Sequence, residues 1–290
     1  MTGRPPASPR HCLAVVTGAS SGIGAATARE LAMAGYHVLA GVRRSEDADA
    51  LQATNLEPIM LDITDEAAIA ALVQRIDADP ERRPLGALVN NAGVAINAPL
   101  EAYKLDALRR LFEVNLFGHV AMIQALLPAL IESRGTIVNI SSVGGKVAMP
   151  TYGPYAGTKF ALEAISDSLR REVAPLGVRV VVVEPGAITT GMLKQVGGRG
   201  AKVVDAMTPI HRDRSAALMH AVVAQAEASV ASGAPPEEAA RIIAHAIISP
   251  RPRTRYTVGR GTGMIVKLTR LVSDRVLDRI LAANLKPYFR

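Results

Sequence analysis

Tyr155 and Lys159 are spaced four residues apart in the stretch SSVGGKVAMPTYGPYAGTKF, residues 141–160. On a helix, residues at this spacing lie on the same face, one turn from each other. A lysine ammonium placed there favours the phenolate and brings the tyrosine pKa down from about 10 towards working pH. Such a tyrosine can donate a proton to the alkoxide that forms when a carbonyl is reduced. The pair therefore predicts proton transfer in the interconversion of a ketone and an alcohol.

The same stretch contains a second tyrosine and a second lysine, and spacing separates the pairs. Tyr152 has Ala156 four positions later, so it lacks a lysine partner on its helix face. Lys146 precedes the helix and has no tyrosine at the matching distance. We interpret both as ordinary residues of the loop and pocket rim. Tyr155 and Lys159 could also be ordinary solvent-facing helix residues, and their context favours chemistry.

A glycine-rich loop, VVTGASSGIG, lies between an apolar run and a helical pattern near the start of the chain. Gly18, Gly22 and Gly24 have the spacing G-x-x-x-G-x-G. Glycines allow the backbone to approach a pyrophosphate, and the helix N-terminus adds free N–H groups and partial positive charge. A tight strand-to-helix turn would use the same glycines. Their position in the first βα unit favours a dinucleotide site.

Strand and helix patterns alternate along most of the chain, which predicts βαβ units and a parallel sheet. The expected fold is therefore α/β, a doubly wound Rossmann-type sheet of about seven strands with helices on both faces. The expected strands are 12–18, 36–42, 57–64, 85–93, 135–142, 178–186 and 254–259, and the main helices are 24–34, 65–77 and 105–131.

After residue 186 the pattern loosens. Residues 189–212 contain four glycines and little periodicity, which predicts a loop, and an alanine-rich helix is expected over 215–232. We interpret 189–232 as a substrate loop or lid. A helix over 234–248 begins with Pro and Glu in its first turn. The sequence contains no internal repeat, so we predict one domain over 10–259 and an extension over 260–290.

Three motifs in the expected order carry a family resemblance: TGASSGIG, NNAG at residues 90–93, and the Tyr-x-x-x-Lys pair. Over residues 13–259 the chain resembles the classical short-chain dehydrogenase/reductase family. The segment VEPGAITTGM and the long C-terminal part are similar to its hydroxysteroid and retinol dehydrogenase-like branch. The resemblance implies a nicotinamide-dependent oxidoreductase.

The resemblance also implies which residues contact the cofactor. Asp62 would hold the adenine, although a turn at a strand end is the simpler interpretation, and NNAG could likewise be only a turn. The implied cofactor residues are Gly18, Ser20, Ser21, Gly22, Ile23, Gly24, Asp62, Ile63, Asn91, Ala92, Gly93, Tyr155, Lys159, Pro185, Gly186, Ile188 and Thr190.

Two further members of the catalytic set follow from the resemblance. The family places a serine thirteen positions before the tyrosine, which selects Ser142 over Ser141. Its hydroxyl would orient and polarise the substrate carbonyl. The family's asparagine, often within N-x-x-G, corresponds to Asn115, which would organise a water-linked proton relay to the lysine. Ser142 as a turn former and Asn115 as a helix-kink residue are the alternatives.

The end of the second strand indicates the cofactor type. A carboxylate there would bind the adenosine ribose of NAD(H), whereas arginine accommodates the 2′-phosphate of NADP(H). Val42 occupies the position of the acid, and Arg43 and Arg44 follow. These arginines could also simply solvate the strand end beside Glu46 and Asp47. We favour NADP(H) over NAD(H), with Arg43 as the principal contact.

The substrate is expected to be an apolar secondary alcohol or ketone, similar to a steroid, retinoid or lipid. Its walls would come from segments with few charges, GGKVAMPTYG and GMLKQVGG. A catalytically silent redox sensor or scaffold on the same fold is the alternative function, and such proteins often lack the tyrosine or the lysine. The candidate substrate residues are Ser142, Gly144, Met149, Tyr155 and Met192.

Charge and composition limit the classes of partner and the cellular location that we expect. The formal net charge is +7, but ten of the 33 Lys and Arg and only two of the 26 Asp and Glu lie in residues 250–290. The basic character therefore belongs to the tail, and nucleic acid is not an expected partner. The single Cys12 fits a reducing compartment, and apolar stretches such as 120–131 are too short to span a bilayer. We expect a cytoplasmic location.

The basic tail mixes apolar residues with Lys267, Arg270, Arg275 and Arg279. It could lie on an anionic membrane surface, or pack its apolar stripe over the substrate cleft or a neighbouring subunit. We expect a homodimer or homotetramer. The six histidines show no metal-ligand spacing, so no metal site is predicted.

Overall fold

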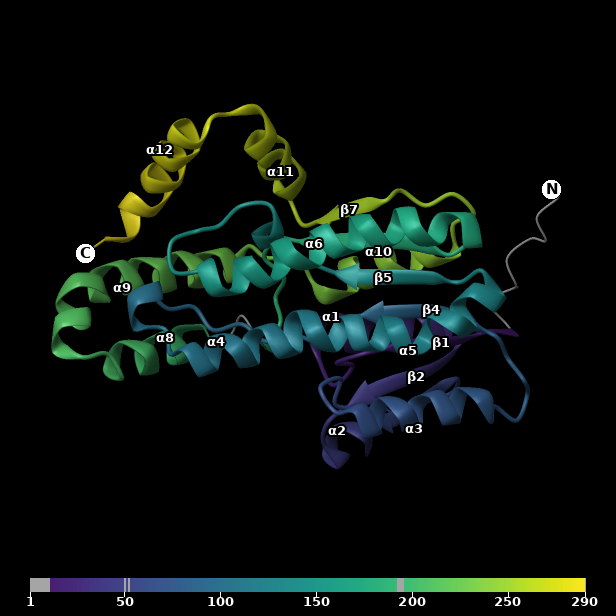
Figure 1. The fold of residues 1–290 in the computed structure, drawn as a ribbon. Helices are drawn as coiled ribbons and strands as arrows, with labels where there is room; N and C mark the ends of the chain where they lie inside the picture. The colour runs from purple at the N-terminus through teal and green to yellow at the C-terminus, as the bar shows by residue number, and fades with distance from the viewer. Residues whose placement is uncertain (1–10, 50, 52, 192–195, 290) are drawn as a thin grey trace.

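A seven-stranded parallel sheet forms the centre of the computed structural model, which describes residues 11–49, 51, 53–191 and 196–289, and their side chains except those of 196–199 and 270. The strand order is β3-β2-β1-β4-β5-β6-β7, and each neighbouring pair is parallel. The predicted doubly wound α/β fold is confirmed (Figure 1). The strands are β1 Leu13–Val16, β2 His37–Val42, β3 Leu56–Met60, β4 Leu85–Asn90, β5 Thr136–Ile140, β6 Arg179–Pro185 and β7 Arg255–Val258.

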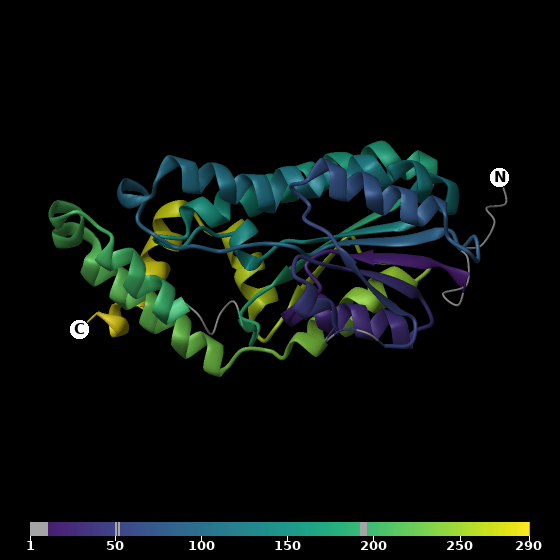
Figure 2. The same cartoon turned by 90° about the horizontal axis from the view of Figure 1, so that it is seen from below.

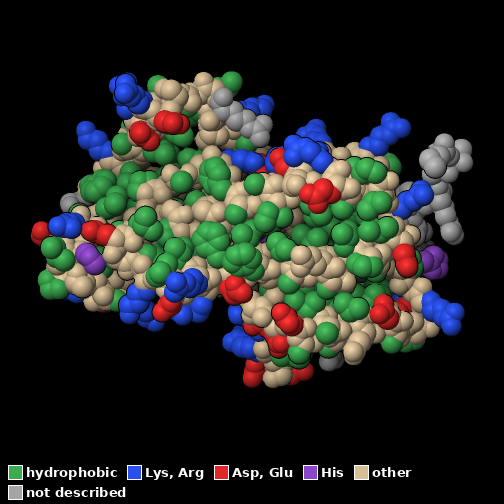
Figure 3. All heavy atoms as spheres, viewed as in Figure 1, with side chains coloured by type: hydrophobic (Ala, Val, Ile, Leu, Met, Phe, Trp, Pro, Cys, Tyr) green, Lys and Arg blue, Asp and Glu red, His purple; other side chains and the backbone are tan. Residues whose placement is uncertain are grey.

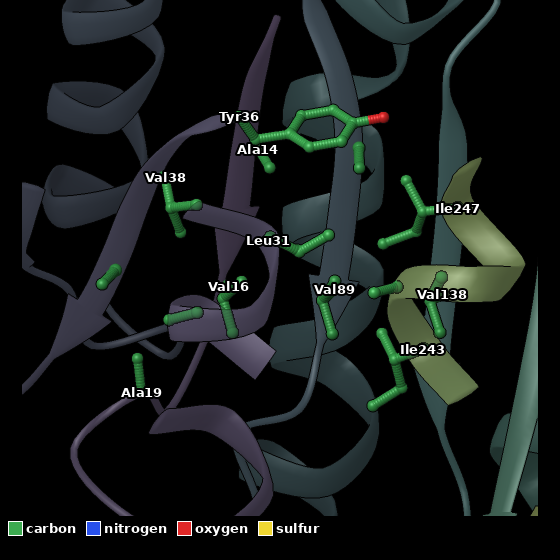
Figure 4. Close-up of a cluster of buried hydrophobic side chains, with 14 of the residues drawn as sticks. Ala14, Val16, Ala19, Leu31, Tyr36, Val38, Val89, Val138, Ile243 and Ile247 are labelled. Carbon is green, nitrogen blue, oxygen red and sulfur yellow. The ribbon is translucent and has the colours of Figure 1, made fainter. Parts of the chain in front are cut away.

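Alternation along the strands divides the core into two layers. In β1, Ala14 and Val16 point to one face and Leu13 and Val15 to the other, as the period of two requires. The first face packs under α1 (Gly22–Met33) and α10 (Pro236–Ile248), as the close-up in Figure 4 shows. The second packs under α3 (Glu66–Asp77), α5 (Gly118–Ser133) and α6 (Gly153–Val173). Figure 2 shows the sheet between these two helical layers.

The order of the strands reverses between β1 and β4. The chain builds outward from β1 to β3 and then crosses back to place β4 on the other side of β1. In open α/β sheets, ligands bind at the carboxyl ends of the strands beside such a switch point. The glycine loop follows β1 and the NNAG segment follows β4, so both lie at this position.

A continuous helical rod of 29 residues runs from Leu105 to Ser133, through α4 (Leu105–Phe112), a π-helical turn (Glu113–Phe117) and α5. An 18-residue window of this rod has a mean hydropathy of 1.7, so by length and composition alone the helix could cross a membrane. The expectation of stretches too short to span is therefore wrong for this helix. Its apolar character has a structural reason, because Met122, Leu126 and Leu130 are buried against the sheet.

The segment after β6 differs from the prediction. The loop expected over 189–212 contains α8 (Val196–Asp205) and the start of α9 (Pro209–Ala231). Alanines and glycines weaken the apolar periodicity that would have revealed these helices. α8 and α9 contact each other, with Val204, Met207 and Met219 buried between them.

The C-terminal segment forms two helices that leave the sheet edge and return to the main body. α11 (Thr262–Leu271) follows β7, and α12 (Asp274–Leu285) ends against α9, as Figure 1 shows in yellow. Leu285 is buried beside Ala221 and Val222, and Gln225 donates a hydrogen bond to the Asn284 carbonyl at 3.2 Å. The short α2 (Ser45–Asp49) completes the described helices of more than one turn.

Candidate active site

The glycine loop has a conformation that side chains would block. Gly18 has a φ of +64°, and a Cβ there would lie 2.8 Å from the Ala92 Cα. Gly22 has a φ of +58°, and a Cβ on Gly24 would collide with the Gly18 carbonyl. The loop leads directly into the N-terminus of α1, where Ser20 and Ser21 are exposed and Ser21 makes no side-chain cap bond. These features fit the pyrophosphate of a dinucleotide, which needs close backbone approach and free N–H groups. Ile23, the loop's remaining predicted contact, is partly buried against the core beneath it.

The NNAG segment is tied to the glycine loop by hydrogen bonds. The Asn91 side-chain amide donates to the carbonyls of Thr17 (2.9 Å) and Gly18 (3.1 Å). In return, the Thr17 hydroxyl accepts from the backbone N–H groups of Asn91 and Ala92, both at 2.9 Å. Asn91 and Ala92 therefore shape the floor of the cleft, and Gly93 lies against the Asn115 side chain. Sequence reasoning missed Thr17, whose hydroxyl directly precedes the first loop glycine.

Arg43 and Asp62 lie where β2 and β3 end side by side. Arg44 forms an ion pair with Asp47 at 2.7 Å, whereas exposed Arg43 has no ion pair within 4 Å among the described residues. Burial raises the pKa of Asp62, but hydrogen bonds from Thr64 and the Arg43 charge outweigh it and lower the pKa. Because no described residue forms an ion pair with Arg43, its exposed guanidinium is available to an anionic ligand at this strand end.

Ile63 faces the core rather than the cleft. Its side chain is buried and packs where a Cβ on Gly118 would lie 2.8 Å from the Ile63 Cγ1. Contact between this residue and a cofactor would therefore use its backbone.

Tyr155 and Lys159 lie on one face of α6, as their spacing predicts. The Lys159 ammonium is 5.9 Å from the centre of the Tyr155 ring and donates to the Ile140 carbonyl at 2.8 Å. Burial lowers the pKa of Lys159 to about 8, and the Glu163 carboxylate opposes that change. Neither residue is an ordinary solvent-facing helix residue, because Lys159 is buried and Tyr155 only partly exposed.

The pKa of Tyr155 differs from the expected direction. Burial raises it above 10, and a hydrogen bond with Ser142 only partly offsets the increase. The expected lowering does not occur in the chain alone because loss of hydration of the phenolate outweighs the favourable contacts. The phenol is therefore protonated at neutral pH, which is the form that a general acid requires.

Ser142 begins the short 3₁₀ turn Val143–Gly145 after β5. Its hydroxyl accepts from the Gly144 N–H at 3.0 Å and lies 3.5 Å from the Pro185 carbonyl. A Cβ on Gly144 would lie 3.3 Å from the Tyr155 ring and 3.4 Å from the Ser142 hydroxyl. Gly144 thus brings the two hydroxyl-bearing residues to one side of the cleft, and Met149 follows on the rim, partly buried.

Asn115 lies in the π-helical turn between α4 and α5 and is fully buried. Its amide accepts from the Val94 N–H and donates to the Val94 carbonyl, both at 2.9 Å, and also donates to Thr158 at 3.2 Å. A π-helical turn interrupts the regular helical ladder and is frequent at functional sites. The irregular helix that the alternative interpretation of Asn115 expected is therefore present as this π-helical turn.

The tyrosine, serine and lysine that were not assigned to catalysis, Tyr152, Ser141 and Lys146, have structural contacts instead. Tyr152 packs in a cluster with Ala221, Val222 and Leu285 from α9 and α12. Burial raises the pKa of Tyr152, and a hydrogen bond with Asn97 opposes the change. Ser141 is buried at the end of β5, and Lys146 forms an ion pair with Glu163 at 2.6 Å.

The turn after β6 is anchored to β7 and leads to a contact with the glycine loop. After Pro185, the Gly186 N–H donates to the Val258 carbonyl at 3.0 Å, which anchors the turn to β7. Ile188 is buried in the core, whereas Thr190 reaches the loop, with its methyl carbon 3.0 Å from a Cβ placed on Gly22. Of the predicted positions, Met192 lies outside the described residues.

His119 is a buried residue of the site that sequence reasoning missed. Its Nε2 lies 2.7 Å from the Ala92 carbonyl, and burial with the Lys159 charge lowers its pKa to about 3. The imidazole is therefore neutral and supports the cleft floor from α5. Its position four residues after Asn115 is the only sequence signal for it.

Comparisons with known proteins agree with this arrangement. Residues 12–199 match the family model described as short chain dehydrogenase. An NADPH-dependent 3-dehydrocapnine reductase of Ornithobacterium rhinotracheale is 34% identical over 282 residues, covering 94% of this chain and 97% of that protein. Mouse retinol dehydrogenase 5 is 33% identical over 288 residues, covering 92% and 86%.

A solved structure supports the same relationship. A short chain dehydrogenase of Burkholderia cenocepacia in complex with NADP superimposes with a TM-score of 0.71 at 28% identity. The match covers 96% of this chain and 99% of that protein.

Proposed function

Because this chain belongs to the classical short-chain dehydrogenase/reductase family and is an oxidoreductase similar to its retinol and hydroxysteroid dehydrogenase-like branch, we propose that it interconverts an apolar secondary alcohol and its ketone with NADP(H). The observation that carries the proposal is the convergence of Ser142, Tyr155 and Lys159 beside the glycine loop, at the switch point of the sheet.

Proton transfer is the task of the chain's own residues. In reduction, the Tyr155 hydroxyl donates its proton to the substrate oxygen, and in oxidation the phenolate takes the proton back. The Ser142 hydroxyl orients the same oxygen. The Lys159 charge reduces the cost of the transient phenolate, because an opposite charge nearby favours the ionised form. When bound, the nicotinamide supplies or accepts the hydride.

The preference for NADP(H) over NAD(H) rests on Arg43. Among the described residues the exposed Arg43 guanidinium at the end of β2 has no ion-pair partner, and it suits a phosphate that needs planar, two-point recognition. Arg44 is already engaged by Asp47 and is a weaker candidate. The NADPH-dependent reductase and the NADP complex among the similar proteins are consistent with this preference.

The apolar substrate class rests on the side of the cleft beyond Tyr155. Tyr152 there packs with Ala221, Val222 and Leu285, all three of them buried, so the elements on this side meet in an aliphatic cluster rather than an ionic one. One of the similar proteins has a name that refers to retinol, and another has a name that refers to 3-dehydrocapnine. A steroid, retinoid or other lipid-like ketone is therefore the first choice for assay.

The decisive experiment is a panel of apolar and polar ketones with NADPH and NADH, followed by loss of nicotinamide absorbance. We expect turnover of apolar ketones and a lower KM for NADPH. Tight NADPH binding without turnover of any ketone would instead favour the redox sensor.

The partners and location stay proposals of their own. Leu105, Phe117 and Phe160 are exposed on α4, the π-helical turn and α6. Hydrophobic side chains cover much of the face shown in Figure 3, and we propose that the face formed by these helices joins copies of the chain into a homodimer or homotetramer. Sedimentation velocity of Phe117→Ser against the unmodified chain tests this. We also propose a cytoplasmic location, without a nucleic-acid partner.

The C-terminal extension has one side against α9 and another exposed. Met264 (75% exposed) and Leu271 (83% exposed) extend from α11 beside the cation Lys267. We propose peripheral contact of this side with an anionic membrane. Co-sedimentation with anionic vesicles should fall in Met264→Gln and persist in Met33→Gln, which removes an equally exposed methionine from α1.

A further inference from the structure

A buried ionic cluster lies behind the candidate catalytic pair. It consists of Lys146, Glu163, Glu184 and Arg255, which we call the Glu163 cluster. The side chains of Glu163 and Glu184 are only 6% and 1% exposed, and those of Lys146 and Arg255 are 14% and 21% exposed. Burying charges is costly unless they are paired, so a cluster of this kind needs an explanation.

One carboxylate oxygen is the centre of the cluster. Glu163 Oε2 accepts from the Lys146 ammonium at 2.6 Å and from the Arg255 guanidinium at 3.0 and 3.1 Å. Glu184 Oε1 lies 3.2 Å from the Arg255 Nε and 3.5 Å from the Lys146 Nζ. The residues come from α6, β6, β7 and the segment after the Val143–Gly145 turn. The contacts therefore fix the position of Glu163 from several elements.

Glu163 also continues the catalytic stripe of α6. Tyr155, Lys159 and Glu163 are spaced by four residues, so they follow one another along one helix face. Lys159 and Glu163 are both buried, and a Cβ on Gly145 would lie 3.2 Å from the Lys159 carbonyl and 3.1 Å from the Glu163 Cγ. The turn containing Gly145 thus packs directly over these two helix positions.

The charged and titratable groups around Lys159 leave Glu163 as its counter-charge. Tyr155 shares its helix, neutral His119 lies near it on α5, and Lys146 pairs with the same Glu163 from the segment after the 3₁₀ turn. Among these, only Glu163 supplies negative charge that favours the ammonium. Burial and the Glu163 charge raise the pKa of Glu184, which makes that residue a weaker source of negative charge.

We propose that Glu163 is a positioning residue whose buried carboxylate, held by Lys146 and Arg255, keeps the Lys159 ammonium charged. The proposal rests on the proposed function for its catalytic meaning. Burial alone favours neutral Lys159, and a neutral amine could not stabilise the Tyr155 phenolate. The cluster therefore links proton transfer in the cleft to ion pairs that do not touch the substrate.

The test is the titration of Lys159 itself in the full chain. Lysine labelled with ¹³C at Cε reports the protonation of each amine by NMR, and Lys159→Met identifies the Lys159 signal. We expect Glu163→Gln to lower the Lys159 pKa by about one unit. Lys146→Met removes a positive charge that offsets the Glu163 carboxylate while Arg255 still holds that carboxylate in place, so the Lys159 pKa should move upward. A structural disturbance alone would not reverse sign between the two variants.

Asp167→Asn is the matched control. Asp167 also pairs with Arg255, at 3.0 Å, but lies a further helical turn from Lys159, so its removal should leave the Lys159 titration almost unchanged. Unchanged titration in folded Glu163→Gln, or an equal shift in Asp167→Asn, would overturn the proposal. If Glu163→Gln does not fold, the Lys146→Met titration decides, with an upward shift in support and no upward shift against.

The readout separates this proposal from the proposed function because it requires no substrate. If an active ketone is found, the high-pH limb of the kcat/KM profile, where Lys159 loses its proton, should move to lower pH in Glu163→Gln. A shifted Lys159 titration in a chain that turns over no ketone would contradict the proposed ketone reduction. It would still support the effect of Glu163 on the charge of Lys159.

Discussion

The Lys159 ammonium lies 5.9 Å from the centre of the Tyr155 ring while its hydrogen bond goes to the Ile140 carbonyl, 2.8 Å away. The lysine is therefore anchored to the end of β5 and acts on the tyrosine through its charge. An anchored charge keeps its position when the phenol changes protonation, which lowers the reorganisation that proton transfer requires.

Replacing Tyr155 with Phe should reduce turnover by about 10²–10⁴-fold, because it removes the general acid. The affinity for NADPH should change little. Steady-state kinetics and a fluorescence titration of NADPH measure the two effects. Tyr152→Phe is the control and should keep most of the activity, since Tyr152 packs against α9 and α12. An inactive Tyr152→Phe variant together with an active Tyr155→Phe variant would show that Tyr152, and not Tyr155, is the general acid.

Replacing Arg43 with Glu should raise the KM for NADPH about 10- to 100-fold, which corresponds to the free energy of a charged hydrogen bond. The KM for NADH should change much less. The measurement is KM for both cofactors with one ketone. Arg44→Glu makes the same charge change at a residue already paired with Asp47. Equal losses in the two variants would mean that general charge at this strand end matters, rather than a specific contact by Arg43.

Replacing Gly18 with Ala should lower the free energy of unfolding by about 1–3 kcal/mol and abolish most NADPH binding. The cause is the positive φ and the close approach to Ala92. Urea unfolding and isothermal titration calorimetry measure the effects. Gly153→Ala serves as control because a Cβ at this first residue of α6 meets nothing within 4 Å. Normal NADPH binding by Gly18→Ala would contradict the assigned cofactor loop.

Replacing Lys159 with Met should inactivate the enzyme and stabilise the fold. The pKa of Lys159 falls from 10.5 to about 8 on folding, so below pH 8 the folded chain bears the full cost of the buried ammonium. Between pH 8 and 10.5 the unfolded chain binds more protons, and stability of the unmodified chain rises with pH. At pH 7 we expect a gain of about 1–2 kcal/mol after subtracting the lost hydrogen bond to Ile140.

Urea unfolding of both chains at several pH values checks this difference. The advantage of Lys159→Met should shrink as the pH rises through 8 and disappear above 10.5. A variant that is less stable at every pH would indicate that the contact with Ile140 outweighs the cost of burying the charge.

Local patterns were enough to predict much of the site. Tyr155 and Lys159 share a helix face because a spacing of four has one geometric meaning on any helix. The glycine loop and the NNAG segment meet because carboxyl ends of parallel strands share one sheet edge. Alternating strand and helix patterns predicted the sheet for the same reason: each element is visible in the residues that form it.

Features that depend on distant partners were not predictable. Glu163 has contacts with Lys146, 17 positions away, and Arg255, 92 positions away, and no local pattern marks these residues as a group. The π-helical turn at Asn115 interrupts a helix whose apolar periodicity looks continuous in sequence. The helix expected over 215–232 corresponds to most of α9, but α8 and the start of α9 were missed because small residues carry too little hydrophobic contrast to show a buried face.

The hydrogen bond between the Thr17 hydroxyl and the Asn91 N–H joins residues that are 74 positions apart. The floor of the cleft therefore cannot form until the chain has crossed from β3 past β2 and β1 and β4 has paired with β1, a slow, non-local event in folding. A partly folded chain would lack this site, so dinucleotide added during refolding should bind only completed molecules. Its binding would shift the folding equilibrium towards the native chain by mass action and protect that chain from proteolysis.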